Sequence, residues 1–220
     1  QRSGQMVRIT SVGGVDAAQR VAAGQPFDLV VLASDAIDKL AAAGHVVPGS
    51  KVDLLRSPLA MAVRHGAAVR PSVDTLQALK DTLQGARAIG YSTGPSGTAL
   101  RQLFQDWGMA DTLRDRLVQA LPGEPVGSLL VRGEVEIGFQ QRSELMHLEG
   151  VDLLGPMPEG AQIVTTFSAA RCAASKQGDT VRELLLETPG RYVQFLGVPK
   201  VRVKLRVHRV LDKKRFAQLP

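Results

Sequence analysis

Short apolar runs rich in β-branched residues alternate with amphipathic segments along most of the chain. The run 27–33 (FDLVVLA) is almost continuously apolar, which is typical of a strand buried on both faces of a sheet. The segments on either side, 15–23 and 35–43, have helical spacing and stop at Gly24 and Gly44, because glycine readily adopts the conformation that ends a helix. Strands that alternate with helices predict an α/β fold.

The same periodicity predicts the other elements. The predicted strands are 6–11, 27–33, 59–63, 86–91, 135–139, 151–154 and 163–172. The predicted helices are 15–23, 35–43, 75–83, 97–107, 126–131, a short one ending at 145–148, and 181–187.

The last part of the chain has a different pattern. Residues 201–207 alternate strictly between Val or Leu and a basic side chain, which predicts a half-exposed strand. The segment 200–220 carries eight basic residues and only Asp212 as an acid. The whole chain has a formal net charge of +6, so the other 199 residues sum to −1. The high isoelectric point therefore belongs to this tail.

Charge and composition exclude several classes of partner. The body of the chain is not basic, and aromatic residues make up only 4%, so we expect no nucleic-acid partner. No apolar run reaches the roughly 18 residues of a membrane span, so we expect no membrane-spanning segment. The first residues show neither a charged nor an apolar leader region, and we expect no signal peptide in this sequence.

Cysteine and histidine give no metal signature. Cys172 is the only cysteine, which excludes an intramolecular disulfide and a cysteine cluster, and we expect it in the core. The four histidines are scattered without metal-ligand spacing. We therefore expect no metal and no cofactor.

Three loops of small residues precede predicted helices: 11–16 (SVGGVD), 91–98 (YSTGPSGT) and 125–127 (PVG). A helix N-terminus presents unpaired N–H groups and the positive end of its dipole, and small residues let a ligand approach the backbone. Such loops follow the carboxyl ends of strands, where ligands bind in open α/β sheets. We expect anion contacts from Gly13, Gly14, Val15, Ser92, Ser96, Gly97, Thr98 and Val126.

Residues 90–94 (GYSTG) also match the G-x-S-x-G pattern of a hydrolase nucleophile between a strand and a helix. A catalytic triad would then require an acid and a histidine downstream of Ser92, for which Asp152 and His208 are the suitable pair. Chance matches are common in a run of hydroxyl and glycine residues, so this reading ranks below anion binding.

Several segments, in order, resemble the molybdate-binding type of periplasmic substrate-binding protein. Residues 13–31 resemble a small-residue loop followed by A-x-x-I-x-x-G-x-P-A-D-V, and residues 37–46 resemble M-D-x-L-x-x-A-G-L-V. Residues 59–64 are similar to the first crossing strand of that family, the loop 91–97 to its second-lobe ligand loop, and residues 131–138 to V-x-x-G-E-x-x-I-G. The order of the set carries the resemblance, over roughly residues 6–186.

The resemblance implies a two-lobed type II periplasmic binding fold, each lobe a mixed sheet flanked by helices. Residues 1–59 and 172–220 would form lobe one, and residues 60–171 would form lobe two. Crossing strands near 59–63 and 167–172 would act as the hinge about which the lobes close on a ligand. The family's first strand and its Ser-bearing loop precede the part that this sequence matches, so we expect that strand to be lacking.

The resemblance also implies what the protein binds. Carried over by position, ligand contacts would come from Gly13 or Gly14, Ser96 with Gly97, Val126, and the pair Gln140 and Gln141. It further implies neutral donors without metal or cofactor, an ABC transporter permease as partner, a monomer, and a periplasmic location.

One departure introduces an alternative. Molybdate binders of this type carry Tyr where Gln141 stands, and the segment 139–145 (FQQRSEL) resembles relatives that include aconitate isomerase. An isomerase of a tricarboxylic acid needs a base with a pKa near neutrality and cationic clamps for the carboxylates. The candidates for the base are Glu144, Tyr91 and Asp16, and those for the clamp are Arg142 and Arg101.

The sequence thus predicts an extracytoplasmic solute-binding protein that captures a small anion, a molybdate-like oxyanion or an organic carboxylate, for an ABC transporter. The alternative is a tricarboxylate isomerase on the same fold. A third hypothesis is a chain that folds without binding a ligand.

Overall fold

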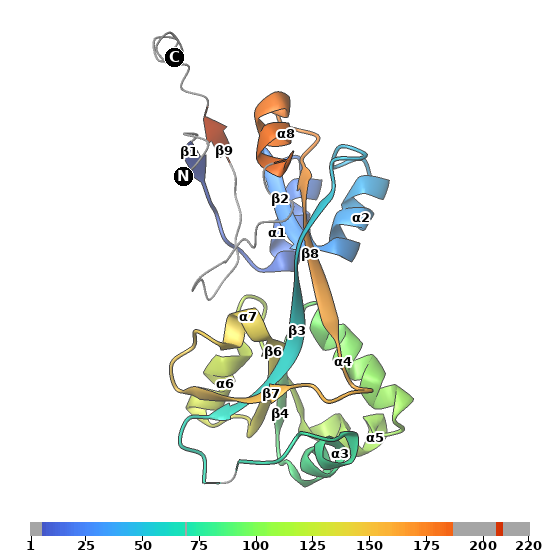
Figure 1. Ribbon diagram of the computed structural model, residues 1–220, viewed down its shortest axis with the longest axis vertical. Helices are drawn as coiled ribbons and strands as arrows, with labels where there is room; N and C mark the ends of the chain where they lie inside the picture. The colour runs from blue at the N-terminus through green and yellow to red at the C-terminus, as the bar shows by residue number, and fades with distance from the viewer. Residues whose placement is uncertain (1–5, 69, 187–205, 209–220) are drawn as a thin grey trace, which may run out of the picture.

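Two lobes joined by two long strands make up the computed structural model, which describes residues 6–68, 70–186 and 206–208 (Figure 1). The connecting strands are β3 (Val52–Arg64) and β8 (Val164–Arg171). They pair antiparallel between the lobes, from Val52 opposite Ala169 to Pro58 opposite Val164.

A single seven-stranded sheet therefore runs through both lobes, in the order β2-β8-β3-β6-β4-β5, with β7 also paired to β3. The remaining strands are β2 (Leu29–Ala33), β4 (Ile89–Tyr91), β5 (Leu117–Gln119), β6 (Ile137–Gln141) and β7 (Val151–Pro156). In the upper lobe of Figure 1, β2 pairs with the end of β8. In the lower lobe, the end of β3 pairs with β6 and β7.

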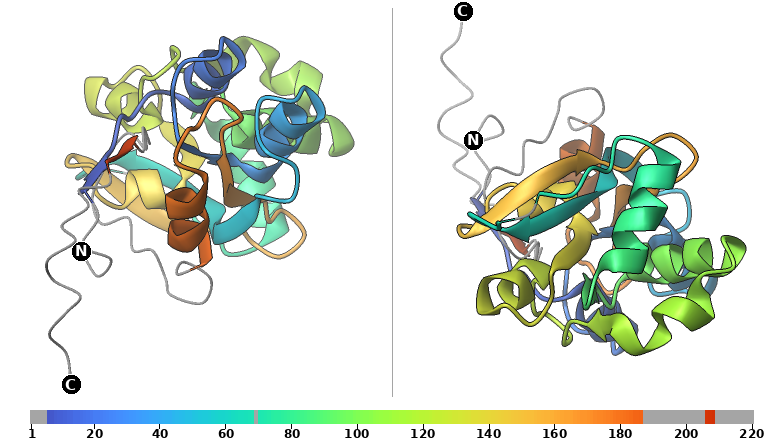
Figure 2. Two further views of the ribbon diagram at one scale, coloured as in Figure 1. Left: turned by 90° about the horizontal axis from the view of Figure 1, so that it is seen from above. Right: turned by 90° about the horizontal axis from the view of Figure 1, so that it is seen from below.

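The upper lobe buries both faces of β2, as its apolar run predicts. Val30 and Leu32 pack in a core with α1 (Gly14–Ala22) and α2 (Ser34–Ala42), and this core also contains Cys172, as expected. Leu29 and Val31 point to the opposite face and pack against α8 (Gly178–Leu186). Strand side chains alternate between faces, so one apolar strand serves helices on both sides, which Figure 2 shows from above.

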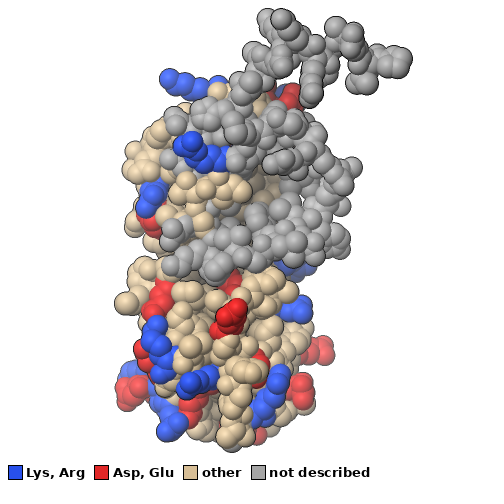
Figure 3. Space-filling view, turned by 90° about the vertical axis from the view of Figure 1, so that its left-hand side faces the viewer, with Lys and Arg blue, Asp and Glu red and all other residues tan. Residues whose placement is uncertain are grey.

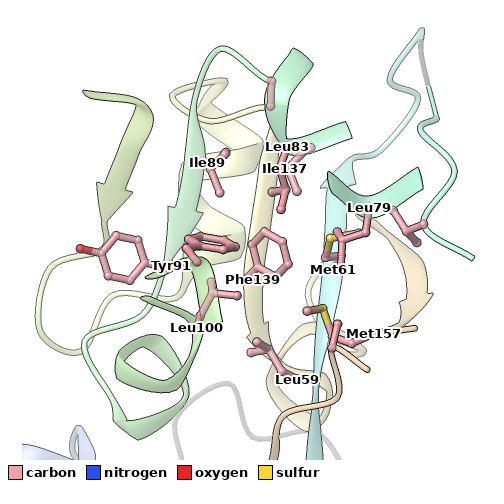
Figure 4. Close-up of a cluster of buried hydrophobic side chains, with 14 of the residues drawn as sticks. Leu59, Met61, Leu79, Leu83, Ile89, Tyr91, Leu100, Ile137, Phe139 and Met157 are labelled. Carbon is pink, nitrogen blue, oxygen red and sulfur yellow. The ribbon is translucent and has the colours of Figure 1, made fainter. Parts of the chain in front are cut away.

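The lower lobe repeats this arrangement along β3. Leu59, Met61 and Val63 point into the larger core, seen in part in Figure 4, whereas Ala60 and Ala62 point into a second core on the other face. The larger core lies under α3 (Leu76–Gly85), α4 (Pro95–Asp106) and α5 (Ala110–Leu113). The second lies under α6 (Val126–Arg132) and α7 (Arg142–Leu145).

Several elements of the structure were not predicted from the sequence pattern. The pattern predicted a strand at residues 59–63, whereas β3 begins at Val52. The prediction began too late because the crossing segment between the two cores is too polar to show a strand pattern. Strand β5, helix α5 and the 3₁₀ turn η1 (Arg114–Arg116) were not predicted, since each is only three or four residues long.

The predicted strand 6–11 is shorter in the structure, where β1 (Met6–Arg8) pairs with β9 (Arg206–His208). The rest of the predicted tail strand, 201–205, lies outside the described residues. Trp107 is partly buried against the larger core, and Lys80 Nζ lies 5.1 Å from its ring centroid.

The crossing between lobes also lies earlier in β3 than the sequence suggested. Residues 59–63 pair with β6 and β7 inside the lower lobe, whereas residues 52–58 pair with β8. Likewise, residues 167–171 of β8 pair with β2 inside the upper lobe. The segments outside the inner pairing of either lobe are therefore 52–58 of β3 and 164–166 of β8.

Candidate functional site

The ends of three parallel strands define one edge of the lower-lobe sheet. Tyr91 at the end of β4 lies opposite Gln119, the end of β5, and opposite Phe139 of β6, which continues for two more residues to Gln141. The loops that follow lead into α4, α6 and α7, at the side of the lower lobe that faces the upper lobe (Figure 1). The sheet thus places the predicted loops 91–98 and 125–127 beside the Gln140–Gln141 pair.

The upper lobe contributes the loop before α1. A Cβ on Gly13 would lie only 3.7 Å from the backbone N of Gly123, in the loop before α6. The two lobes therefore come into contact at these glycines. Gly13, Gly14 and Val15 are exposed, so the backbone at the start of α1 is accessible beside this contact.

The β4–α4 loop is tightly folded. Ser92 Oγ and Ser96 Oγ lie 3.3 Å apart, and Ser96 is buried. A Cβ on Gly97 would fall 1.9 Å from the carbonyl oxygen of Ser92, so only glycine fits there. Thr98 is exposed on the first turn of α4. Of the residues predicted in this loop, Ser92, Ser96 and Gly97 form one packed unit.

Gln140 connects two parts of the site. Its Oε1 accepts a hydrogen bond of 2.9 Å from the backbone N–H of Val126, and its Nε2 donates to Glu144 Oε2. The Val126 N–H was predicted as a ligand donor, but in this structure it donates to Gln140. The amide therefore caps α6 and holds Glu144 at the same time.

Gln141 lies on the neighbouring strand position and has different partners. Its side chain is 5% exposed, and Nε2 donates to Thr165 Oγ1 on β8 at 2.6 Å. Its Oε1 is buried without a hydrogen-bond partner among the described residues, and the same holds for Ser11 Oγ before α1. Buried polar atoms are nearly always paired, so an unpaired one marks a place for a further partner.

A pair of hydroxyls lies at the level of the Gln141–Thr165 hydrogen bond. Ser57 Oγ on β3 is 3.1 Å from Ser143 Oγ on α7. Ser57 also pairs across the two crossing strands with Thr165. Ser57, Ser143 and Thr165 were not predicted, because the partner of each is distant along the chain. The hydroxyl of Thr165 within a predicted crossing strand is the signal that could have pointed to it.

Glu144 is the titratable group of the site. Burial raises its pKa, and the hydrogen bond from Gln140 opposes that rise. The other candidate bases are placed less favourably: Tyr91 packs within the larger core (Figure 4), and Asp16 pairs with Arg20 at 2.8 Å along α1.

The candidate clamps Arg142 and Arg101 have exposed side chains. On the face that Figure 3 shows, basic and acidic residues are interspersed over the lower lobe. Neither arginine is buried beside the two glutamines, so the described part of the site relies on neutral donors.

The prediction of a hydrolase triad was wrong. Asp152 accepts a hydrogen bond from His65 at 2.9 Å and pairs with Val63, at the end of the lower lobe away from Ser92. His208 pairs with Met6 in the small sheet of β1 and β9. The three residues do not meet.

Within the described ranges, no group of three or more His, Cys, Asp or Glu side chains could hold a metal ion. Among the helices that the structure describes, none is long and apolar enough to cross a membrane.

Comparison with known proteins gives the family. Residues 1–186 match the model of the bacterial extracellular solute-binding proteins. The chain belongs to this family. Membership implies an extracytoplasmic location.

The solved structures that resemble this solute-binding protein show the same fold. The periplasmic molybdate-binding protein of Azotobacter vinelandii aligns with a TM-score of 0.69 at 19% identity, covering 86% of this chain and 84% of that one. A periplasmic thiamin-binding protein aligns at 0.62 and 19%, covering 80% and 66%. The type II periplasmic binding fold expected from the sequence is therefore confirmed.

A relative at higher identity carries a different name. The aconitate isomerase of a Pseudomonas species is 39% identical over 166 residues, which are 76% of this chain. They are 63% of that protein, so the chain spans less than two thirds of the relative's length.

Proposed function

We propose that this solute-binding protein takes a small organic carboxylate between its lobes, at the edge where β4, β5 and β6 end. The observation that carries the proposal is the buried Gln141 amide, whose Oε1 has no partner among the described residues, next to the Gln140–Glu144 pair. A carboxylate accepts hydrogen bonds, so it pairs with this amide once the amide turns by half a turn, when Oε1 accepts from the Thr165 hydroxyl and Nε2 points at the ligand. Pairing the buried amide in this way recovers a cost of about 1–3 kcal/mol.

A carboxylate suits these side chains better than a compact oxyanion. A Glu144 with a raised pKa can take up a proton and donate it in a hydrogen bond to a ligand carboxylate. The Gln141 amide adds a donor on an extended side chain, which fits a branched organic acid. The 39% identity to an enzyme named for aconitate also exceeds the 19% shared with a molybdate binder.

In this proposal the two lobes close on the ligand, with Gly13 facing Gly123 across the junction. Gly13, Gly14 and Val15 offer the N-terminus of α1, and Ser92, Ser96, Gly97 and Thr98 offer that of α4. The protein would act as a periplasmic monomer and deliver its ligand to an ABC transporter permease.

A second candidate function is isomerisation of a tricarboxylic acid. Two observations favour it: the raised pKa of Glu144, which brings a carboxylate toward the range of a general base, and the relative named aconitate isomerase. Glu144 would remove a proton from one carbon of the ligand and return it to another, with no net change in atoms.

Two measurements test these proposals. In a thermal-shift panel of molybdate, tungstate, sulfate, citrate, cis-aconitate and trans-aconitate, a ligand of the native state raises the melting temperature by mass action. We expect a shift with tricarboxylates; a shift with molybdate and tungstate alone would overturn the proposal. Interconversion of cis- and trans-aconitate, absent in Glu144→Gln, would identify the isomerase, and binding without interconversion would identify a carrier.

A further inference from the structure

We propose that Gln140 is a positioning residue, which ties Glu144 to the N-terminus of α6 and leaves one carboxylate oxygen of Glu144 for the ligand. This inference rests on the proposed function for the identity of the ligand. The positioning itself can be measured without any ligand.

The orientation of the Gln140 amide follows from its neighbours. A backbone N–H can only donate, so the oxygen of the amide must face Val126, at 2.9 Å. The Nε2 group is then directed at Glu144 and donates to Oε2. No rotation of the amide by half a turn would satisfy both contacts.

Burial makes this arrangement firm. Gln140 is 5% exposed and Val126 is fully buried, so water does not compete for their hydrogen bond. Gln141, the adjacent amide, is held by Thr165 on the crossing strand. Among the described residues, Gln140 is therefore the side chain that holds the Glu144 carboxylate.

The arrangement leaves Glu144 with one committed and one open oxygen. Oε2 accepts from Gln140, and Oε1 accepts no hydrogen bond from the part of the chain that the structure describes. Helix α7, which carries Glu144, packs against β3, β6 and β7. The charged residues of these four elements are Asp53, Arg56, Arg64, Arg142 and Asp152, and none of them forms an ion pair with Glu144 in the described structure.

The charge of Glu144 consequently depends on two opposing influences, burial and Gln140. Burial raises the pKa of the carboxyl, and the Gln140 hydrogen bond lowers it by stabilising the ionised form. Loss of the donor should leave burial unopposed.

The test follows the Glu144 carboxyl by ¹³C NMR as the pH is varied, without ligand. In Gln140→Met we expect the midpoint to rise by about one pH unit, the equivalent of one hydrogen bond to a charged group. The matched control is Gln141→Met, which removes the neighbouring amide and should leave the midpoint within about 0.3 unit. An unchanged or lower midpoint in Gln140→Met would overturn the inference.

A measurement on the wild-type protein guards against a variant that fails to fold. The Val126 backbone amide and the Gln140 side-chain amide should both shift with the same midpoint as Glu144, because the three groups form one chain. Independent behaviour of either amide would contradict the proposal.

Ligand binding supplies the final readout. If Gln140 positions Glu144, Gln140→Met moves the pH profile of tricarboxylate affinity in the same direction as the Glu144 midpoint. A merely structural role would lower affinity by the same factor at every pH. A Glu144 midpoint that moves as expected in a protein that binds no carboxylate would support the positioning and reject the proposed function.

Discussion

The amide of Gln141 donates to the hydroxyl of Thr165 at 2.6 Å, which ties the end of β6 in the lower lobe to the strand β8 that crosses between the lobes. At the same rung, Ser57 of β3 lies 3.1 Å from Ser143 of α7. Both crossing strands are thus attached to the β6–α7 turn at one level. Any bending between the lobes therefore has to occur on the upper-lobe side of this level.

A second link between the crossing strands marks where the bending segment ends on the side of the upper lobe. Ser168 donates to Asp53 at 2.6 Å, which links the two crossing strands again, and the pairing between them is irregular from Asp53 to Leu55. A bulge is a point where strands bend easily. The two linked rungs therefore confine bending to residues 54–56 of β3 and 166–167 of β8. Gln141 connects this segment directly to the candidate ligand site.

The first prediction concerns this connection. Thr165→Val removes the anchor of the Gln141 amide and should weaken carboxylate binding by roughly tenfold, with a loss of about 1–2 kcal/mol in stability. Thr166→Val is the matched control, because Thr166 lies next in the same strand and has no side-chain hydrogen bond in the described structure. Calorimetric titration of both variants decides; equal affinities would contradict the assigned role.

The second prediction separates stability from binding. The double variant Gln141→Met with Thr165→Val replaces both partners by apolar groups, which is nearly neutral for a buried pair. We expect its free energy of unfolding to lie within about 1 kcal/mol of wild type, while ligand binding is lost. Urea unfolding measures the first quantity and titration the second. Retained binding would show that Gln141 does not touch the ligand.

The third prediction concerns the β4–α4 loop. Gly97→Ala places a Cβ 1.9 Å from the Ser92 carbonyl oxygen, a backbone atom that cannot move away without disturbing the loop. We expect a loss of more than about 3 kcal/mol, or failure to fold. Gly94→Ala is the control, since a Cβ there meets no atom within 4 Å and the change should cost less than about 1 kcal/mol. Similar costs in both variants would refute the packing argument.

The fourth prediction is a pH dependence. Burial raises the pKa of Glu144 above its ordinary value of 4.5, so the folded state holds this proton more tightly than the unfolded state. The contribution of Glu144 to stability is therefore complete below pH 4.5 and declines as the pH rises through the folded pKa. Glu144→Gln lacks this decline, so its stability relative to wild type should increase with pH across that window. Urea unfolding of both proteins at several pH values measures this difference. A difference in stability that does not change with pH, or that decreases as the pH rises, would contradict the prediction.

Part of the fold could be read from local pattern. The run at 27–33 predicted a strand buried on both faces, and β2 packs Val30 and Leu32 on one side and Leu29 and Val31 on the other. The extent of β3 could not be read from the sequence, because only Val52 and Leu54 pack against the upper-lobe core and residues 55–58 pair with β8 between the two cores, where no alternating pattern is imposed.

The candidate site was predictable only by strand ends. The loop 91–98 was predicted because it follows the carboxyl end of a strand, and the Gln140–Gln141 pair was predicted from the family resemblance. Their partners were not, because Thr165 is 24 residues from Gln141 and Ser143 is 86 residues from Ser57. The Gln140 amide also occupies the Val126 N–H that the helix start alone suggested was available.

The most direct test of the central claim is calorimetric titration of the wild-type protein with trans-aconitate, cis-aconitate, citrate and molybdate, repeated on the variant that combines Gln141→Met with Thr165→Val. We predict saturable binding of one tricarboxylate per chain, abolished in the double variant, and no binding of molybdate. Tight binding of molybdate without any carboxylate, or carboxylate binding that the double variant retains, would contradict a carboxylate site built on Gln141.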